Sequence, residues 1–129
     1  MAKRKILVVD DEPDFLKMIK KRLEDNSYEV VTAKDGKEAL VKIAAEKPSA
    51  VLLDIMMPEI DGISVLKTIR AKDKDLPIFM CTASTNVEKF RVSRQLNASG
   101  YIFKTADLKK EVENITKFLH LADKFKGTK

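Results

Sequence analysis

The chain has 129 residues, of which 44% are hydrophobic and 35% are charged, with only four glycines and four prolines. This composition is typical of one globular domain and excludes disordered and fibrous proteins. The single cysteine, Cys81, excludes an internal disulfide framework and fits a reducing compartment. The longest apolar runs are far too short to span a bilayer, and no signal-peptide core follows the basic N-terminus, so we expect a cytoplasmic protein without a membrane segment.

The net charge of +5 is unevenly distributed, because the first half of the chain is acidic and the second half is basic. Acidic residues gather at Asp10-Asp11, and Asp54 has Asp61 nearby, which indicates a cation site. The lysines of the second half are scattered among acids, with no interleaved aromatic residues. This pattern favours a solvated surface, or an acidic partner, over direct nucleic-acid binding.

Apolar runs of strand length alternate with segments whose apolar residues recur at helical spacing. In chain order we expect a strand over Arg4–Val9, a helix from about Pro13 to Glu24, a strand over Tyr28–Ala33, a helix over Gly36–Glu46, a strand over Ala50–Leu53, a helix after Asp61-Gly62, a strand over Pro77–Cys81, a helix from about Asn86 to Leu96, a strand over Gly100–Phe103 and a helix from about Ala106 to Lys124. The strands are almost continuously apolar, as expected for a sheet covered on both faces.

Several helix ends carry recognisable signals. Pro13 suits a first helical turn, and Asp35 with Glu38 resembles a capping pair. Thr85 with Glu88 forms a possible capping box, and Asn97 suits a left-handed helix stop. Five strand–helix units with short loops predict an α/β fold with a parallel sheet and right-handed crossovers. The common order for such a sheet is 2-1-3-4-5, the flavodoxin-like (βα)5 arrangement, whose switch point lies between the first and third strands.

Polar residues follow the expected strands where parallel strands all end at one edge of the sheet. Asp10-Asp11, Asp54, Thr82 and Lys104 should therefore converge. Three clustered carboxylates repel one another unless a cation lies among them, and all-oxygen ligands suit Mg²⁺. A metal, a carboxylate, a hydroxyl and a lysine are the groups that phosphoryl transfer requires.

Each residue has a simpler explanation when it is considered alone. Asp10-Asp11 could cap the first helix, and Thr82 could cap the fourth. Lys104 is one lysine among many and gains weight only from its position. The convergence of all of them favours a binding site over these separate structural roles.

The same residues resemble a response-regulator receiver domain over essentially the whole chain. The resemblance is carried by four segments in order, Ile6–Glu12, Leu52–Gly62, Thr82-Ala83 and Tyr101–Lys104. It implies a single receiver domain over residues 1–129, with a core from about 3 to 125 and no output domain in this chain. It also implies a signalling switch that catalyses only its own phosphorylation and dephosphorylation.

By this resemblance, Asp54 would be the phosphoacceptor. Asp11 and Asp54 would bind Mg²⁺ together with the backbone carbonyl of Met56, while Asp10 would act largely through water. The phosphoryl group would come from a phosphohistidine on a sensor histidine kinase or a histidine phosphotransfer protein.

The resemblance also implies how the signal leaves the site. Thr82 would move toward the phosphoryl oxygens, Lys104 would pair with them, and Tyr101 would turn inward as the switch aromatic. The surface around the fourth helix, fifth strand and fifth helix would then engage or release an unidentified protein target. A homodimer that forms on phosphorylation is a further possibility.

Two positions depart from the family pattern. Thr105 follows Lys104 where the family usually has proline after a cis peptide bond, and a non-proline cis bond costs about 2.5–4 kcal/mol. Asn97-Ala98 replaces the common Gly-Ala, a mild change because Asn tolerates positive φ.

Two other function classes fit less well. An aspartate-nucleophile phosphohydrolase would have Asp-x-Asp at one strand end, whereas position 56 is Met. A pseudo-receiver that only binds partners is favoured by Thr105 alone, against the intact acidic residues.

Overall fold

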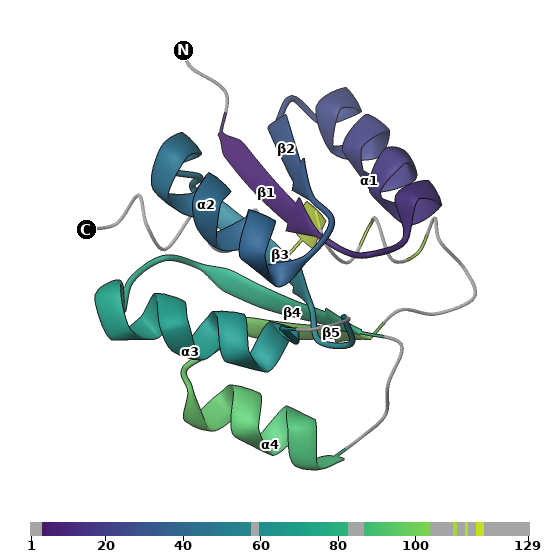
Figure 1. Cartoon of the computed structure of the whole chain (residues 1–129). Helices are drawn as coiled ribbons and strands as arrows, with labels where there is room; N and C mark the ends of the chain where they lie inside the picture. Colours follow the sequence, from purple (N-terminus) through teal and green to yellow (C-terminus); the bar gives the residue numbers. More distant parts are fainter. Residues whose placement is uncertain are drawn as a thin grey trace.

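The structure, a computed structural model, describes residues 4–57, 60–82 and 87–103, together with residues 110, 113, 116 and 117. The elements follow one another as β1 (Lys5–Val9), α1 (Pro13–Asp25), β2 (Glu29–Ala33), α2 (Gly36–Glu46), β3 (Ala50–Asp54), α3 (Gly62–Lys72), β4 (Ile78–Thr82), α4 (Val87–Gln95) and β5 (Gly100–Phe103), as shown in Figure 1. None of the helices within these residues is long and apolar enough to cross a membrane.

The five strands form one parallel sheet in the order β2-β1-β3-β4-β5, which confirms the predicted flavodoxin-like topology. Half of the strand ends coincide with the predicted ones, and the other half differ by a single residue. β4 starts at Ile78 and not at Pro77, since proline has no N–H to donate to the ladder. The Pro77 carbonyl still accepts a hydrogen bond from the Val51 N–H at 2.9 Å.

Alternate residues of the central strands enter two separate hydrophobic cores, one on each face of the sheet. Ile6 and Val8 of β1 point into the core that α1 covers with Ile19 and Leu23. Leu7 and Val9 point into the opposite core, to which α2 and α3 contribute four buried residues, Ala39, Val65, Leu66 and Ile69. In Figure 1, α2, α3 and α4 follow one another along this second face. Burial on both faces explains the nearly continuous apolar strands.

The described helix ends largely match the sequence signals. The Asp35 side chain accepts a hydrogen bond from the Glu38 N–H and caps α2, and Asn97 adopts the left-handed conformation with φ of 64°. The N-cap residue of α1 is Glu12, whose side chain makes no capping hydrogen bond. The Thr85–Glu88 capping box lies outside the described side chains. Residues 110, 113, 116 and 117 of the expected last helix are helical.

Candidate functional site

Two buried carboxylates follow neighbouring strands at the switch point of the sheet. Val9 of β1 lies opposite Leu53 of β3, so the next residues, Asp10 and Asp54, end the two strands side by side. Asp10 is 1% exposed and Asp54 is 4% exposed. Among the described residues, Ser93 is the only other buried polar side chain. Carboxylates are rarely buried to this extent without a binding partner or a functional role.

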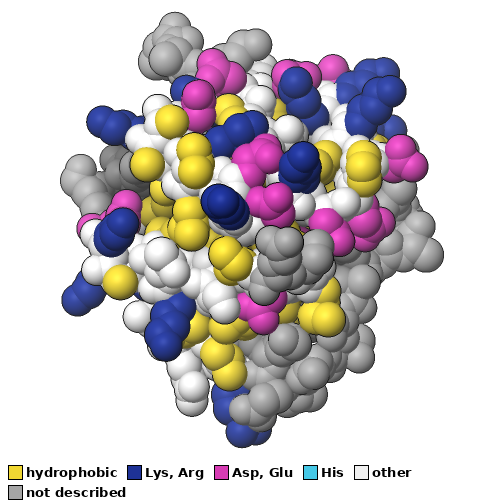
Figure 2. Space-filling view, in the orientation of Figure 1, with side chains coloured by type: hydrophobic (Ala, Val, Ile, Leu, Met, Phe, Trp, Pro, Cys, Tyr) yellow, Lys and Arg dark blue, Asp and Glu magenta, His cyan; other side chains and the backbone are white. Residues whose placement is uncertain are grey.

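The acidic cluster at the end of β1 consists of Asp10, Asp11 and Glu12, whose carboxylate oxygens all lie within 4.8 Å of one another. Asp10 Oδ1 accepts a hydrogen bond from the Glu12 N–H at 2.9 Å, and this tight turn brings the Glu12 side chain back beside the two aspartates. Sequence reasoning did not select Glu12. Its position directly after the aspartate pair was the available signal. Figure 2 shows acidic side chains over the loop that joins β1 to α1.

Asp54 is not one of these three residues, and its carboxylate contacts its own loop. Asp54 Oδ1 accepts a hydrogen bond from the Met56 N–H at 3.3 Å. The loop continues into α3, where the Gly62 N–H donates to the Ile55 carbonyl at 2.9 Å. Asp54 therefore faces the start of the β3–α3 loop, with the 53% exposed side chain of Met56 beside it.

Gly62 allows this loop to pack against the end of β3. A Cβ atom at this position would lie 2.1 Å from the Asp54 backbone oxygen and 2.9 Å from Ile55 Cα. Both contacts are with backbone, which cannot move aside without displacing Asp54 itself. The absence of a side chain at Gly62 thus allows the start of α3 to lie directly against the backbone of Asp54.

The donor set at this edge fits a hard divalent cation. The acidic cluster and Asp54 offer only carboxylate oxygens, and neither a thiol nor an imidazole belongs to the group. Oxygen ligands of this kind suit Mg²⁺, which prefers one or two carboxylates and retains several waters. Three like charges within 4.8 Å also favour a cation electrostatically.

The structure locates the remaining predicted site residues unequally. Thr82 ends β4, one residue after Cys81, which pairs with Asp54. The backbone of Thr82 therefore lies at the same edge, while its side chain is outside the described part of the chain. Lys104 and Thr105, and the peptide bond between them, also lie outside the described residues.

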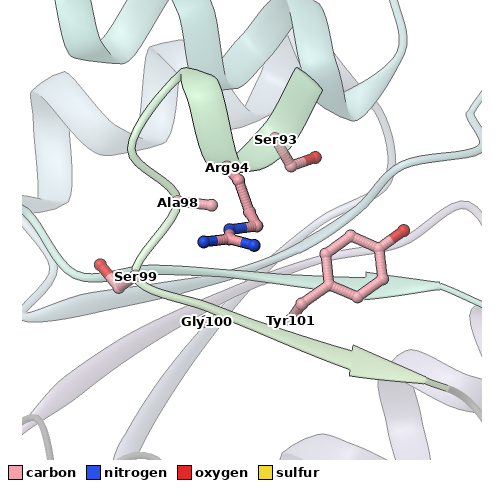
Figure 3. Close-up of a pocket in the computed structure, with 6 residues that line it drawn as sticks. All are labelled: Ser93, Arg94, Ala98, Ser99, Gly100 and Tyr101. Carbon is pink, nitrogen blue, oxygen red and sulfur yellow. The ribbon is translucent and has the colours of Figure 1, made fainter. Parts of the chain in front are cut away.

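Tyr101 lies on β5 and packs against the core on the α2 and α3 side of the sheet. The residue is half-buried, its hydroxyl oxygen is buried, and this burial raises the pKa of the phenol. The ring also lines a cavity between α4 and β5, which Figure 3 shows. The sequence carried no signal for this cavity, since it depends on how α4 packs onto the sheet.

Comparison with known proteins was made by sequence and by structure. The response regulator receiver domain family matches residues 6–116. Its curated relatives include a probable transcriptional regulator ycf27 of Porphyridium aerugineum, 40% identical over 96% of this chain and 51% of its own length. Another is the alkaline phosphatase synthesis transcriptional regulatory protein PhoP of Bacillus subtilis, 42% identical over 78% of this chain and 42% of its own length. The chain thus spans about half the length of such relatives.

Solved structures of similar fold cover nearly the whole chain. The chemotaxis protein CheY4 of Vibrio cholerae is 31% identical, with a TM-score of 0.82 over 91% of this chain and 99% of its own. The response regulator TrrA of Thermotoga maritima, solved in complex with Mg²⁺ and BeF, is 36% identical, with a TM-score of 0.78 over 89% of this chain and 98% of its own.

Proposed function

The chain belongs to the response-regulator receiver domains of two-component systems, which are phosphorylation-dependent signalling switches, and we propose that Asp54 is its phosphoacceptor. The observation that carries this proposal is the pair of buried carboxylates, Asp10 and Asp54, at the ends of adjacent strands in register. Asp54 would accept the phosphoryl group and also contribute to the cation site, while Asp10 belongs to the acidic cluster that attracts the cation.

The reaction transfers a phosphoryl group between two side chains. A carboxylate oxygen of Asp54 attacks the phosphorus of a phosphohistidine on a sensor histidine kinase or a histidine phosphotransfer protein. The P–N bond breaks, its electron pair returns to the imidazole, and an acyl phosphate remains on Asp54. The Met56 N–H, which already donates to Asp54 Oδ1, orients the carboxylate for this attack.

Asp11, Asp54 and the Met56 carbonyl would hold Mg²⁺, with Asp10 acting largely through water. When bound, Mg²⁺ would supply positive charge that neutralises the phosphoryl oxygens. The Thr82 hydroxyl and the Lys104 ammonium would bind the same oxygens. We add Glu12 to the residues around the proposed Mg²⁺ site, because its carboxylate lies within the acidic cluster.

The added charge at Asp54 biases an equilibrium between two surface states. Tyr101 links the site to α4 and β5, because its half-buried ring can turn inward to a more buried position. The altered surface, together with the last helix, engages or releases a protein target, and a homodimer of the phosphorylated form is an alternative outcome.

Intact mass measurement tests the phosphoacceptor directly. We expect one phosphoryl group to appear on incubation with acetyl phosphate and Mg²⁺, and to be absent after addition of EDTA. The Asp54→Asn variant should remain unmodified. The Asp61→Asn variant is the matched control, because Asp61 caps α3 in the same loop and should not change labelling.

Labelling of folded Asp54→Asn, or equal labelling with EDTA, would contradict the proposal. Absence of labelling in the folded wild-type protein, with no binding of Mg²⁺, would instead favour the pseudo-receiver.

A further inference from the structure

Met56 differs from the other methionines that the structure describes, because it lies at the surface. It is 53% exposed, whereas Met57 is 8% exposed and Met80 is fully buried in the core on the α2 and α3 side. Met18 of α1 is partly buried and packs against the opposite core. An oxidant in solvent reaches an exposed thioether far more readily than one inside a core.

The exposure of Met56 follows from its place in the β3–α3 loop. Ile55 and Met57, on either side of it, are both buried in the core on the α2 and α3 side, which leaves the intervening side chain at the surface. The Met56 N–H donates to Asp54 Oδ1 at 3.3 Å. The residue that carries the exposed thioether therefore also contacts the carboxylate of the proposed phosphoacceptor.

Hydrogen peroxide oxidises a thioether in a single two-electron step. A lone pair of the Met56 sulfur attacks one peroxide oxygen, an S–O bond forms and the O–O bond breaks. The sulfur loses two electrons, and the peroxide gains them and leaves as water after a proton transfer. The product is a polar sulfoxide, which methionine sulfoxide reductases return to the thioether.

The sulfoxide changes what the Met56 side chain offers to a cation. A thioether is a soft ligand that does not suit Mg²⁺, whereas a sulfoxide presents an oxygen atom, the donor type that Mg²⁺ prefers. Mg²⁺ retains several waters in protein sites, and such waters can donate hydrogen bonds to nearby oxygens. The methionine side chain has three rotatable bonds, so at an exposed position its oxygen can turn toward such a water.

We propose that Met56 is a reversible oxidation site for peroxide and that its sulfoxide strengthens Mg²⁺ binding beside Asp54. The inference rests on the proposed function for the presence of the cation site and adds redox control to it. The acidic cluster supplies the negative charge, with its carboxylate oxygens within 4.8 Å of one another. The sulfoxide carries no net charge, so it adds an acceptor without adding to the repulsion among the carboxylates.

Peptide mapping by mass spectrometry, after graded exposure of the full chain to hydrogen peroxide, tests the oxidation site. If the rate follows the exposed fraction, Met56 should be oxidised about six times faster than Met57, and Met80 more slowly still. Oxidation of Met57 or Met80 as fast as Met56 would overturn the inference. This measurement uses neither Mg²⁺ nor a phosphoryl donor.

Isothermal titration calorimetry with Mg²⁺ alone tests the consequence on reduced protein and on protein oxidised at Met56. We expect the Kd for Mg²⁺ to fall about fivefold on oxidation, the effect of one hydrogen bond, and to recover after reduction by a methionine sulfoxide reductase and a thiol. Met56→Gln carries an amide oxygen in place of the sulfoxide oxygen and should bind Mg²⁺ more tightly than the wild-type protein without any peroxide.

Met56→Leu is the matched control, since it keeps the approximate volume and removes the sulfur. The Kd of this variant should be the same before and after peroxide. The variant retains Cys81 and the other methionines, so a peroxide response in it would assign the effect to those residues and overturn the inference.

The same titration separates this inference from the proposed function. An unchanged Kd after oxidation, in a protein whose reduced form binds Mg²⁺, would contradict the inference alone. Absence of Mg²⁺ binding by both the reduced and the oxidised protein would contradict the proposed cation site, and the inference with it.

Discussion

The edge of the sheet at which the strands start (the amino edge) and the edge at which they end (the carboxyl edge) carry charged residues in opposite arrangements. At the amino edge, Lys5 Nζ lies 3.3 Å from Glu29 Oε2 and 3.2 Å from Glu46 Oε1. The same ammonium donates to the Glu46 carbonyl at 3.3 Å, which ties β1 to the end of α2. At the carboxyl edge, the acidic cluster holds three like charges within 4.8 Å.

The ion pairs of Lys5 stabilise the fold, whereas the acidic cluster is arranged to bind a cation. Opposite charges at the amino edge satisfy one another within the chain. Like charges at the carboxyl edge raise the free energy of the folded chain until a cation compensates them. Removal of one acidic charge should therefore destabilise the fold at the amino edge and stabilise it at the carboxyl edge.

The largest effect is expected for Gly62→Ala at the carboxyl edge. Alanine is the better helix former by about 1 kcal/mol, but its Cβ would lie 2.1 Å from the Asp54 oxygen. The clash with fixed backbone should dominate and lower the free energy of unfolding by about 3 kcal/mol, the upper range for overpacking. Urea unfolding followed by circular dichroism measures this loss.

Gly36→Ala is the matched control for Gly62→Ala. The nearest atom to its Cβ is Val65 Cγ2 at 2.8 Å, a side-chain atom that can move, while the Ile60 oxygen lies 3.0 Å away. We expect a clearly smaller loss for this variant. A loss as large as that of Gly62→Ala would mean that the end of β3 is no more constrained than the start of α2.

Asp10→Asn should act in the opposite direction, with a smaller magnitude. It removes one of the clustered charges, and Asn Oδ1 can keep the hydrogen bond from the Glu12 N–H. Without divalent cations, we expect the free energy of unfolding to rise by about 1 kcal/mol, the typical size of a single-substitution effect.

Addition of Mg²⁺ should then stabilise the wild-type protein more than Asp10→Asn, because ligand binding to the folded state adds to its stability. Urea unfolding with and without Mg²⁺ measures both the stability gained by Asp10→Asn and the stabilisation of each protein by Mg²⁺. Asp75→Asn, in the exposed α3–β4 loop, removes an equal charge and should show neither change. A less stable Asp10→Asn protein without cations would show that the cluster is not repulsive.

The smallest effect is expected for Glu46→Gln at the amino edge. Hydrogen bonds to Glu46 and Glu29 raise the pKa of Lys5 above its ordinary value of 10.5. The interaction of Lys5 with these glutamates therefore stabilises the fold at neutral pH and up to about pH 10.5. This stabilisation is lost as the pH rises through the folded-state pKa of Lys5. Glu46→Gln should therefore lower stability slightly at neutral pH and converge with the wild-type protein at higher pH.

Salt screens exposed ion pairs, so the difference between Glu46→Gln and the wild-type protein should also shrink at high ionic strength. Glu24→Gln, on the exposed end of α1, is the matched control in the same denaturant series. A difference that persists at high pH and high salt would assign the role of Glu46 to packing.

The sequence was sufficient for the fold because each strand and helix had its own local signal. Alternation of buried strands with helical spacing led to the strand order, and Asp35 and Asn97 marked helix ends correctly. The convergence of Asp10 and Asp54 followed from topology alone, since both residues end neighbouring parallel strands.

Features that depend on side-chain packing were beyond the sequence. The turn that brings Glu12 beside Asp10 is set by one side-chain hydrogen bond, and the engagement of Asp54 by Met56 is set by another. The cavity beside Tyr101 arises from the packing of α4 on β5, which no local pattern encodes. The predictions for Thr82 and Lys104 side chains remain predictions.

The position of β1 in the middle of the sheet has a consequence for synthesis of the chain on the ribosome. β1 pairs with β2 on one side and with β3 on the other, and β3 ends at Asp54. A nascent chain that has emerged only as far as α2 can pair β1 with β2, but it leaves the other side of β1 as an open edge. Open edges template pairing with other chains, so this interval is when the emerging polypeptide most needs a chaperone.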